Sequence, residues 1–279
     1  MRKVSVITGG AGGMGLATAK LMGQDHQVVI CDVSQERLDA AQAELRGLGI
    51  ACEAVVCDIT NRESVAELVR RAQQLGTVAS LIHTAGVSPQ MGKPELIMRI
   101  NALGTIHVSD ACYAIAQEGF CLVNVASMAA YTLPNLFVPT RAYKLAGTDQ
   151  EAFLRKALFV GNFLPQKLRS GIAYSISKNF VVWYSKQQAA RFGQKGGRVL
   201  SVSPGSIDTA MGRLEIKSGS EKMLQFAALK RFGRPEEVAE VLAFCASDKA
   251  SYLTGIDILC DGGVIAGVTP KDLRSLSVD

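Results

Sequence analysis

The sequence lacks the patterns by which metal sites and disulfide frameworks are usually recognised. Its seven cysteines include no C-x-x-C pair, and neither they nor the three histidines show the spacing of a zinc site. Several cysteines stand in apolar runs, such as Cys121 in the segment 119–123, where a free thiol behaves as a small hydrophobic side chain. We therefore expect no metal ion, reduced thiols and a cytoplasmic location.

Long runs of like charge and of apolar residues are missing as well. The chain of 279 residues has a formal net charge of +5, but its basic residues are scattered in pairs such as Arg70–Arg71, so no nucleic-acid partner is expected. The longest charge-free stretch, 120–140, contains Asn124 and Pro134, which argues against a membrane span. A strand-like segment begins almost at Met1, so no signal peptide is expected.

Apolar runs of strand type alternate with segments of helical periodicity along the chain. This alternation predicts an α/β fold, with a single doubly wound sheet of seven mostly parallel strands and helices on both faces. No linker, internal repeat or low-complexity segment divides the chain, so residues 1–279 are expected to form one domain. The expected strands are 4–8, 27–31, 52–57, 79–84, 121–125, 198–202 and 256–260, and the expected helices are 14–23, 34–48, 61–75, 95–117, 173–192 and 235–246.

One segment, between 131 and 171, does not continue this alternation. Within it, residues 149–160 place Phe153, Leu154 and Phe159 among charged residues, which predicts a short amphipathic helix. A connection of this length in a compact domain is usually a lid, a binding loop or a disordered segment.

A glycine-rich turn follows the first expected strand and opens the first expected helix. Glycine admits positive φ and lets backbone N–H groups approach a pyrophosphate with no Cβ in the way. The helix N-terminus adds unpaired N–H donors and a partial positive charge. In this setting the turn predicts a dinucleotide phosphate site, and a tight turn without a ligand is the alternative. The residues assigned to it are Gly9, Gly12, Gly13, Met14 and Gly15.

Asp32 ends the second expected strand and bears on the choice of cofactor. A carboxylate at this place can accept hydrogen bonds from the adenosine ribose and would repel a 2′-phosphate. No Arg or Lys stands in the glycine turn or directly after Asp32, and the nearest, Arg37, lies a turn into the next helix. We therefore expect NAD rather than NADP.

Tyr174 and Lys178 are four residues apart, a spacing that places both side chains on one face of a helix. A tyrosine with its ordinary pKa near 10 is a poor base at neutral pH, and lowering that pKa by about three units requires roughly 4 kcal/mol. A nearby ammonium, together with the positive nicotinamide ring of an oxidised cofactor, can supply this. The pair alone is a weak signal, because Tyr-x-x-x-Lys is common in proteins.

Ser127 and Asn101 are candidates for the same site. Ser127 follows the fifth expected strand, at the carboxyl edge where ligands bind in such sheets, and its hydroxyl can orient a substrate oxygen. Asn101 lies inside an expected helix, where a short amide competes with backbone hydrogen bonds, which predicts a kinked turn and a water relay. A capping hydroxyl and a surface amide are the plain alternatives.

Together these residues closely resemble the short-chain dehydrogenase/reductase family. They occur in the family's order from residue 4 to about 263, so the resemblance covers nearly the whole chain. The motifs that carry it are the Thr8–Gly15 turn, Asp58-Ile59, Thr84-Ala85-Gly86, Asn101, Ser127, Tyr174 with Lys178, Pro204-Gly205 with Thr209, and Asp261-Gly262-Gly263.

The resemblance implies a single Rossmann-type domain and assigns further cofactor contacts. It places Asp58 and Ile59 against adenine, and Ile207 and Thr209 against the nicotinamide carboxamide. It also assigns to cofactor binding Val33, Ala85, Gly86, Tyr174, Lys178, Pro204 and Gly205. By the same resemblance the protein is expected to form a homodimer or homotetramer.

The chain departs from the family pattern in two places. His83 stands where the family usually has asparagine, and a lone histidine there is more often a structural hydrogen-bonding group than a catalyst. Ser127 and Tyr174 are also farther apart than in typical members. The segment 86–90 and the insertion, about residues 132–170, resemble the bacterial branch that includes hydroxysteroid dehydrogenase/carbonyl reductases.

These features predict an NAD(H)-dependent oxidoreductase that interconverts a secondary alcohol and a ketone. The insertion precedes the helix of Tyr174, so we expect it to act as a lid over a hydrophobic, cyclic or steroid-like substrate, or else as an interface element. The apolar residues expected to cover the substrate are Phe153, Leu158, Phe159, Phe163 and Leu164, with docking to a membrane surface as a third alternative and ordinary packing as the commonest meaning of such spacing. The alternative function is a non-catalytic NAD-binding regulator or scaffold.

Overall fold

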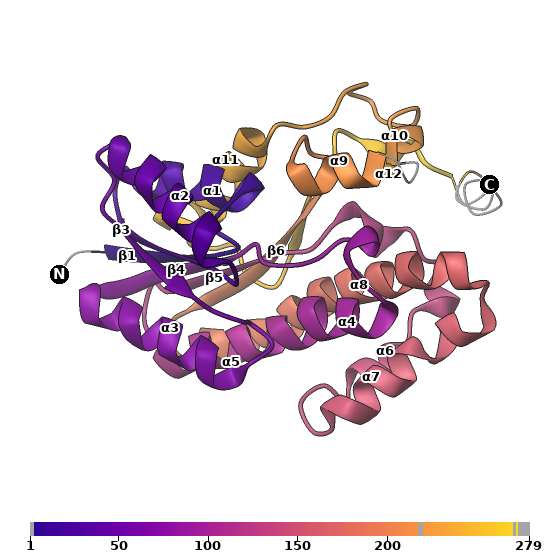
Figure 1. Cartoon of the computed structure of the whole chain (residues 1–279). Coiled ribbons are helices and arrows are strands. Elements are labelled where there is room, and N and C mark those ends of the chain that lie inside the picture. Colours follow the sequence, from indigo (N-terminus) through magenta and orange to yellow (C-terminus); the bar gives the residue numbers. More distant parts are fainter. Residues whose placement is uncertain (1–2, 217–219, 270–271, 273–279) are drawn as a thin grey trace.

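Seven strands form one sheet in the computed structural model, which describes residues 3–216, 220–269 and 272 (Figure 1). The order across the sheet is β3-β2-β1-β4-β5-β6-β7, and each neighbouring pair is parallel. The predicted doubly wound sheet is therefore confirmed, with parallel pairing throughout. The strands are β1 (Lys3–Thr8), β2 (Gln27–Asp32), β3 (Cys52–Val56), β4 (Thr77–His83), β5 (Cys121–Val125), β6 (Arg198–Pro204) and β7 (Asp257–Cys260).

Helices cover both faces of the sheet, as Figure 1 shows. One face is covered by α1 (Gly13–Met22), α2 (Gln35–Gly47) and α11 (Pro235–Ala246), whose apolar residues form a core cluster with Ile7, Ile30 and Leu200. The other face is covered by α3 (Arg62–Leu75), α5 (Gly104–Ile115) and α8 (Gln166–Gly193). Strands buried on both sides in this way explain their nearly continuous apolar sequences.

The predicted helix starts agree with the capping residues. Ser34 accepts a hydrogen bond from the Arg37 N–H at the start of α2, and Asn61 accepts bonds from two N–H groups of α3. The helix predicted over 95–117 is divided into α4 (Pro94–Met98), a π-helical turn at Arg99–Leu103, and α5. Asn101 lies in that turn, so the kink expected at this residue is present.

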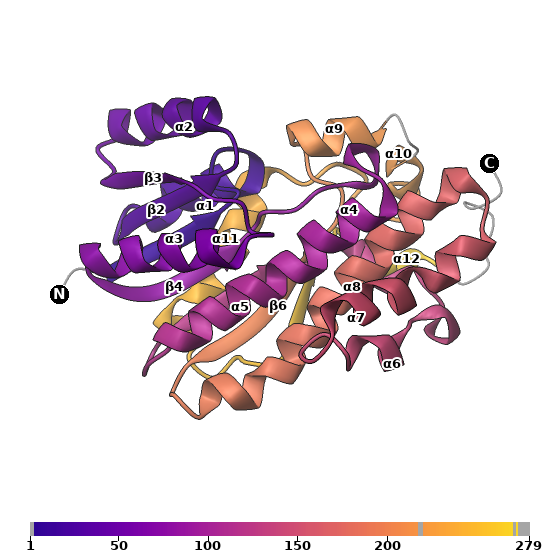
Figure 2. The same ribbon diagram turned by 60° about the horizontal axis from the view of Figure 1, so that its bottom comes forward.

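The insertion, which carries the labels α6 and α7 in Figure 2, folds against the outer side of α4 and α8. It comprises short helical turns at Asn135–Phe137 and Phe159–Phe163, and the helices α6 (Thr140–Tyr143) and α7 (Gln150–Leu158). The following helix, α8, begins at Gln166 rather than at 173 as predicted.

The apolar face of α7 does not cover a substrate as predicted. Phe153 is fully buried, and its ring lies 4.7 Å from that of Phe180 and 6.2 Å from that of Tyr143, measured between centroids. Leu154 joins the same core cluster. Helical spacing of apolar residues predicts that one face of a helix is buried. It does not predict whether substrate or protein covers that face, which is why the expectation failed here. Phe159 and Phe163 remain exposed.

Short elements surround the carboxyl ends of the strands. They are η1 (Pro89–Met91), η3 (Met128–Tyr131), α9 (Ala210–Ile216), α10 (Ser220–Met223) and α12 (Val264–Gly267), whereas η6 (Asp248–Ala250) lies at the opposite edge, where Asp248 pairs with Lys3. Of these, α9 packs against η1 above the sheet edge. Among the described residues, every helix is too short or too polar to cross a membrane.

Candidate active site

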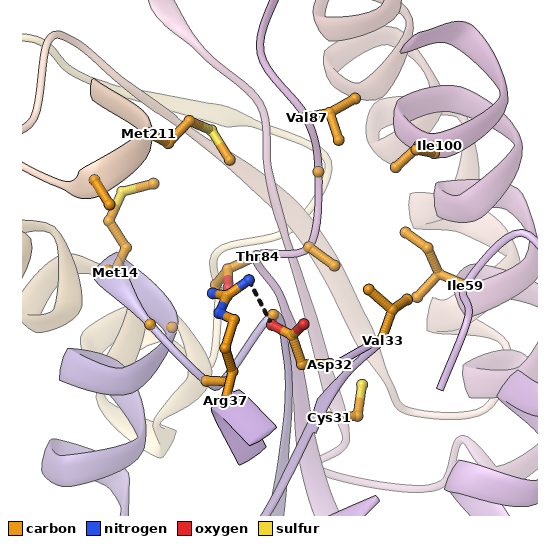
Figure 3. A pocket seen from close by; sticks show the side chains of 18 of the residues that line it. Met14, Cys31, Asp32, Val33, Arg37, Ile59, Thr84, Val87, Ile100 and Met211 are labelled. Atoms are coloured by element: carbon orange, nitrogen blue, oxygen red, sulfur yellow. Dashed lines mark ion pairs between the residues drawn. The ribbon is translucent and has the colours of Figure 1, made fainter. Parts of the chain in front are cut away.

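A cleft of about 450 Å³ opens at the carboxyl ends of β1, β2, β3 and β4 (Figure 3). Twelve of the residues predicted to bind a cofactor line it, and they come from segments far apart in the sequence. They are Gly9, Gly12, Gly13, Met14, Gly15, Asp32, Val33, Asp58, Ile59, Ala85, Gly86 and Thr209. Figure 3 shows Met14 and Met211 on one side of the cleft, and Val33, Ile59, Val87 and Ile100 on the other.

The glycine turn fits a dinucleotide pyrophosphate. Gly9 and Gly13 have φ of +65° and +52°, and a Cβ on Gly15 would lie only 2.3 Å from the Gly9 carbonyl oxygen. Gly12 caps α1 without a side-chain hydrogen bond, and the first turn of α1 holds no acidic residue. The N-terminal N–H groups of this helix are therefore open to an anion, and its dipole favours one.

Asp32 is buried at the end of the cleft where β2 ends, and Arg37 reaches back to it. The Asp32 carboxylate accepts a hydrogen bond from the Ser34 N–H at 3.2 Å, and its other oxygen lies 3.4 Å from an Arg37 guanidinium nitrogen. Arg37 also lines the cleft beside Gly12. Arg37 was expected to lie too far along the next helix to act at this place, and that expectation is wrong. The first turn of α2 returns to the end of β2, and the arginine side chain is long.

Tyr174 and Lys178 lie together near the carboxyl end of β5. The Lys178 ammonium donates a hydrogen bond to the Val125 carbonyl at 3.0 Å and lies 5.9 Å from the centroid of the Tyr174 ring. Ser127 accepts a bond from the Ala129 N–H, and its hydroxyl is near enough to the Tyr174 phenol to lower the pKa of that group. The three side chains form one cluster.

This cluster adjoins the cleft at Gly86. A Cβ on Gly86 would lie 3.4 Å from the Lys178 ammonium and 3.1 Å from Asn101 Oδ1. The absence of a side chain thus lets the cleft wall approach both groups. Asn101 holds that wall in place, because its amide donates to the Val87 carbonyl and accepts from the Val87 N–H at 3.0 and 2.9 Å. It also donates to Ser177, on α8.

The electrostatics of the cluster differ from those expected. Burial raises the pKa of Tyr174 strongly, and the carboxylate of Glu215 raises it further. Burial lowers the pKa of Lys178 to about 8, while Glu215 raises it. In the chain by itself the pKa of the phenol is thus raised, because desolvation of the hydroxyl dominates. That Lys178 and an oxidised nicotinamide together lower it stays a prediction.

Glu215 is the residue of this region that sequence reasoning missed. It lies on α9, four positions after Met211, which lines the cleft, so both side chains project from one face of the helix. Burial raises the pKa of its carboxyl group, and Lys178 and the Ser88 hydroxyl lower it. No motif marks Glu215 in the sequence. A glutamate in so short a helix would ordinarily be expected to be exposed to solvent.

Three residues assigned to the cofactor lie away from the cleft. Gly205 and Ile207 line a separate cavity of about 120 Å³ with Asp261, and Pro204 is buried at the end of β6. Gly205 packs on the backbone of Asp261, where a Cβ would lie 2.7 Å from its Cα. The Pro204-Gly205 motif thus packs the end of β6 against the segment after β7. Of the assigned residues between 204 and 209, Thr209 is the one that lines the cleft.

His83 joins two strands of the sheet, as expected of a structural residue. Its Nδ1 lies 2.7 Å from the Thr8 hydroxyl, which pairs β4 with β1 below the cleft. Burial lowers its pKa to about 3, so the imidazole is neutral at physiological pH. Within the described part of the chain, all seven cysteines are free and no three His, Cys, Asp or Glu side chains gather as a metal site.

Comparison with known proteins gives two matching family models. One, described as short chain dehydrogenase, matches residues 3–147, and the other, described as enoyl-(acyl carrier protein) reductase, matches residues 166–265. The stretch between the two matches lies within the insertion.

Individual relatives span almost the whole chain. A short-chain dehydrogenase/reductase of Alternaria brassicicola is 31% identical, covering 95% of this chain and 97% of its own. The 3-oxoacyl-(acyl-carrier-protein) reductase of Thermotoga maritima is also 31% identical, covering 94% and 98%. Among solved structures, that of gox2181 is 27% identical and covers 95% and 96% of the two chains with a TM-score of 0.76. A Burkholderia cenocepacia short chain dehydrogenase in complex with NADP covers 94% and 97% with a TM-score of 0.74 at 24% identity.

Proposed function

Because the chain belongs to the short-chain dehydrogenase/reductase family, we propose that it is an NAD(H)-dependent enzyme that interconverts a secondary alcohol and a ketone. The observation that carries the proposal is the cluster of Tyr174, Lys178 and Ser127, placed where the glycine-lined cleft passes Gly86. A dinucleotide held by the glycine turn supplies or accepts the hydride. A protein that only senses NAD has no chemical need for such a cluster beside its cofactor site.

Each group of the cluster has a distinct role in this proposal. Ser127 holds the substrate oxygen, and Tyr174 gives it a proton in reduction or takes its proton in oxidation. Lys178 stabilises the phenolate with its charge, and donors not used by Val125 can reach a ribose. Asn101 keeps the Val87 segment against α8, and its remaining Oδ1 lone pair is the place for a relay water.

The raised pKa of Tyr174 fixes the protonation state from which the proposed reaction starts. A phenol that stays protonated at neutral pH is ready to donate a proton to a carbonyl oxygen, whereas oxidation first requires its ionisation. The chain by itself thus holds the phenol in the form that reduction uses, while the overall equilibrium and the pH set the direction. The relative in Thermotoga maritima is also named as a reductase.

NAD is the proposed cofactor because Asp32 meets the ribose end of the cleft as a buried carboxylate. Arg37 opposes this preference, since its guanidinium lies at the same end and suits a 2′-phosphate. We place Asp32 first, because the guanidinium is more than half exposed and is already paired with that carboxylate.

The substrate is proposed to be a hydrophobic cyclic or steroid-like molecule. Val87, Met91, Ile100 and Met211 give the cleft an apolar wall close to the cluster (Figure 3). For the insertion we propose contact with a second copy of the chain. Its aromatic pair, Phe159 and Phe163, is 58% and 75% exposed and has no role in the core.

The test is turnover of cyclic ketones with NADH by the purified protein. Tyr174→Phe is expected to lower kcat by about 10²-fold or more while NADH binding, followed by calorimetry, is retained. Tyr252→Phe is the matched control, because Tyr252 is fully exposed. Retention of most activity by Tyr174→Phe would show that another group moves the proton. Binding of NADH with no turnover of any ketone would favour the regulator or scaffold.

A further inference from the structure

Glu215 and Ser88 face each other beside the proposed reaction centre. Ser88 lies two residues after Gly86, at the start of η1, and is fully buried. Glu215 lies on α9, which packs against η1. The Ser88 hydroxyl approaches the carboxylate closely enough to lower its pKa. The pair therefore lies behind the cleft lining, next to the lining residues Gly86, Val87 and Met211.

The carboxylate of Glu215 also acts on the reacting groups themselves. It raises the pKa of both Tyr174 and Lys178, so it lies within the electrostatic range of the proton-transfer cluster. A substrate whose carbonyl oxygen meets Tyr174 is therefore exposed to the same negative charge. Met211, one turn earlier on the same helix, lines the cleft from the same side.

The pair is incompletely hydrogen-bonded. Glu215 Oε1 and Ser88 Oγ are both buried, and neither has a hydrogen-bond partner of ordinary geometry in the protein. Buried polar atoms are nearly always paired, and a buried carboxylate oxygen without a donor is costly. The Lys178 ammonium does not fill this place, since its hydrogen bond goes to the Val125 carbonyl.

We propose that Glu215 and Ser88 form a polar subsite that binds a hydrogen-bond donor on the substrate, a hydroxyl or ammonium group separate from the reacting carbonyl. The inference rests on the proposed oxidoreductase function and narrows its substrate class to hydroxyketones and aminoketones. The carboxylate accepts the donor's hydrogen, and the Ser88 hydroxyl can donate to a substrate hydroxyl. An entirely apolar ring would leave the carboxylate unpaired and is selected against.

The experiment compares cyclohexanones that carry a methyl, hydroxyl or amino group on the same ring carbon. These substituents are similar in size, so a difference between them reports hydrogen bonding rather than fit. The wild type is expected to show a kcat/KM about 10- to 150-fold higher for the hydroxyl or amino compound than for the methyl compound. Glu215→Ala is expected to reduce this ratio to within about threefold of unity.

Conservative variants separate the subsite from a structural role. Glu215→Gln retains an acceptor and should keep most of the hydroxyl preference but lose the amino preference, because the negative charge is gone. Ser88→Ala should weaken the hydroxyl preference alone. Glu221→Gln removes an exposed carboxylate from the neighbouring α10 and should change neither ratio. If Glu215→Ala fails to fold, the Gln and Ser88 variants decide the question.

Binding measurements distinguish failure of this inference from failure of the proposed function. Affinities of the three compounds are measured by calorimetry for the NADH complex of Tyr174→Phe, with and without Glu215→Gln. Turnover without any preference that depends on Glu215 would overturn the subsite. A preference in binding that depends on Glu215, without turnover by the wild type, would support the subsite and overturn the reaction.

Discussion

Replacement of Asp32 by serine is expected to shift the cofactor preference from NAD towards NADP. In the structure, the Asp32 carboxylate is 7% exposed, while its partner Arg37 is 58% exposed and 3.4 Å away. Removing the carboxylate takes away an acceptor for the ribose hydroxyls and frees Arg37 for a 2′-phosphate. Both effects lower the ratio of kcat/KM for NAD to kcat/KM for NADP.

The size of the shift follows from two energies. A hydrogen bond to a charged acceptor contributes about 1.5–3 kcal/mol, which NAD loses. Two like charges about 4 Å apart repel by roughly 4 kcal/mol at an effective dielectric of 20, which NADP no longer meets. Exposure of Arg37 and screening by salt reduce the second figure substantially. We expect a net change of about 2–4 kcal/mol, or about 30- to 1000-fold in the ratio of kcat/KM for NAD to that for NADP.

The assay is reduction of one cyclic ketone with NADH and NADPH at fixed ionic strength. Glu36→Gln, which removes an exposed carboxylate from the same turn of α2, is the matched control and should leave the ratio unchanged. Asp32→Ser combined with Arg37→Ala should lose most of the gain for NADPH, because the cation is then missing. A ratio for Asp32→Ser within threefold of the wild type would refute the reasoning, as would a wild type that already prefers NADPH.

Two further changes test burial in the structure. Lys178 has a pKa of about 8, below its ordinary 10.5, so the folded protein binds fewer protons there than the unfolded chain between these values. The free energy of unfolding of the wild type, relative to that of Lys178→Met, should therefore be flat up to pH 7 and rise by about 2 kcal/mol by pH 9.5. Urea denaturation at each pH measures it, and a decrease in this difference above pH 7 would contradict the burial of Lys178. Phe153→Ala should destabilise the protein by about 3–5 kcal/mol, while the exposed Phe163→Ala should change stability by about 0.5 kcal/mol at most. Small and equal losses would mean that α7 is not part of the core.

The fold was predictable because its signals are local and repeated. Strands buried on both faces have continuous apolar sequences, and Ser34 and Asn61 mark helix starts by their capping chemistry. The glycine turn was predictable for the same kind of reason, since positive φ and close backbone approach restrict the residue type at Gly9 and Gly15. The π turn was signalled by a short amide at Asn101 inside an apolar helix.

The features that were not predictable depend on the position of the far end of a side chain and on its neighbours in the fold, not on the position of its Cα in the sequence. Arg37 starts in α2, yet its guanidinium lies over the end of β2 beside Asp32. Phe153 belongs to an amphipathic helix whose period was evident, but the period does not tell whether substrate or protein covers its apolar face. Glu215 stands in a seven-residue helix with no sequence signature. Such placements are set by tertiary packing.

Glu215 gives the proton-transfer cluster a charge balance that the resemblance to a family could not supply. Burial by itself disfavours the phenolate form of Tyr174 and the ammonium form of Lys178. A neighbouring carboxylate stabilises the ammonium form of Lys178 and disfavours the phenolate form of Tyr174, so at neutral pH it keeps both protons in place. That is the charge state from which a ketone is reduced. A substrate ammonium paired with Glu215 would weaken this bias, whereas a substrate hydroxyl would leave the negative charge and the bias intact. The same side chain thus links the proposed selection of a polar substituent to the protonation state of the proposed proton donor.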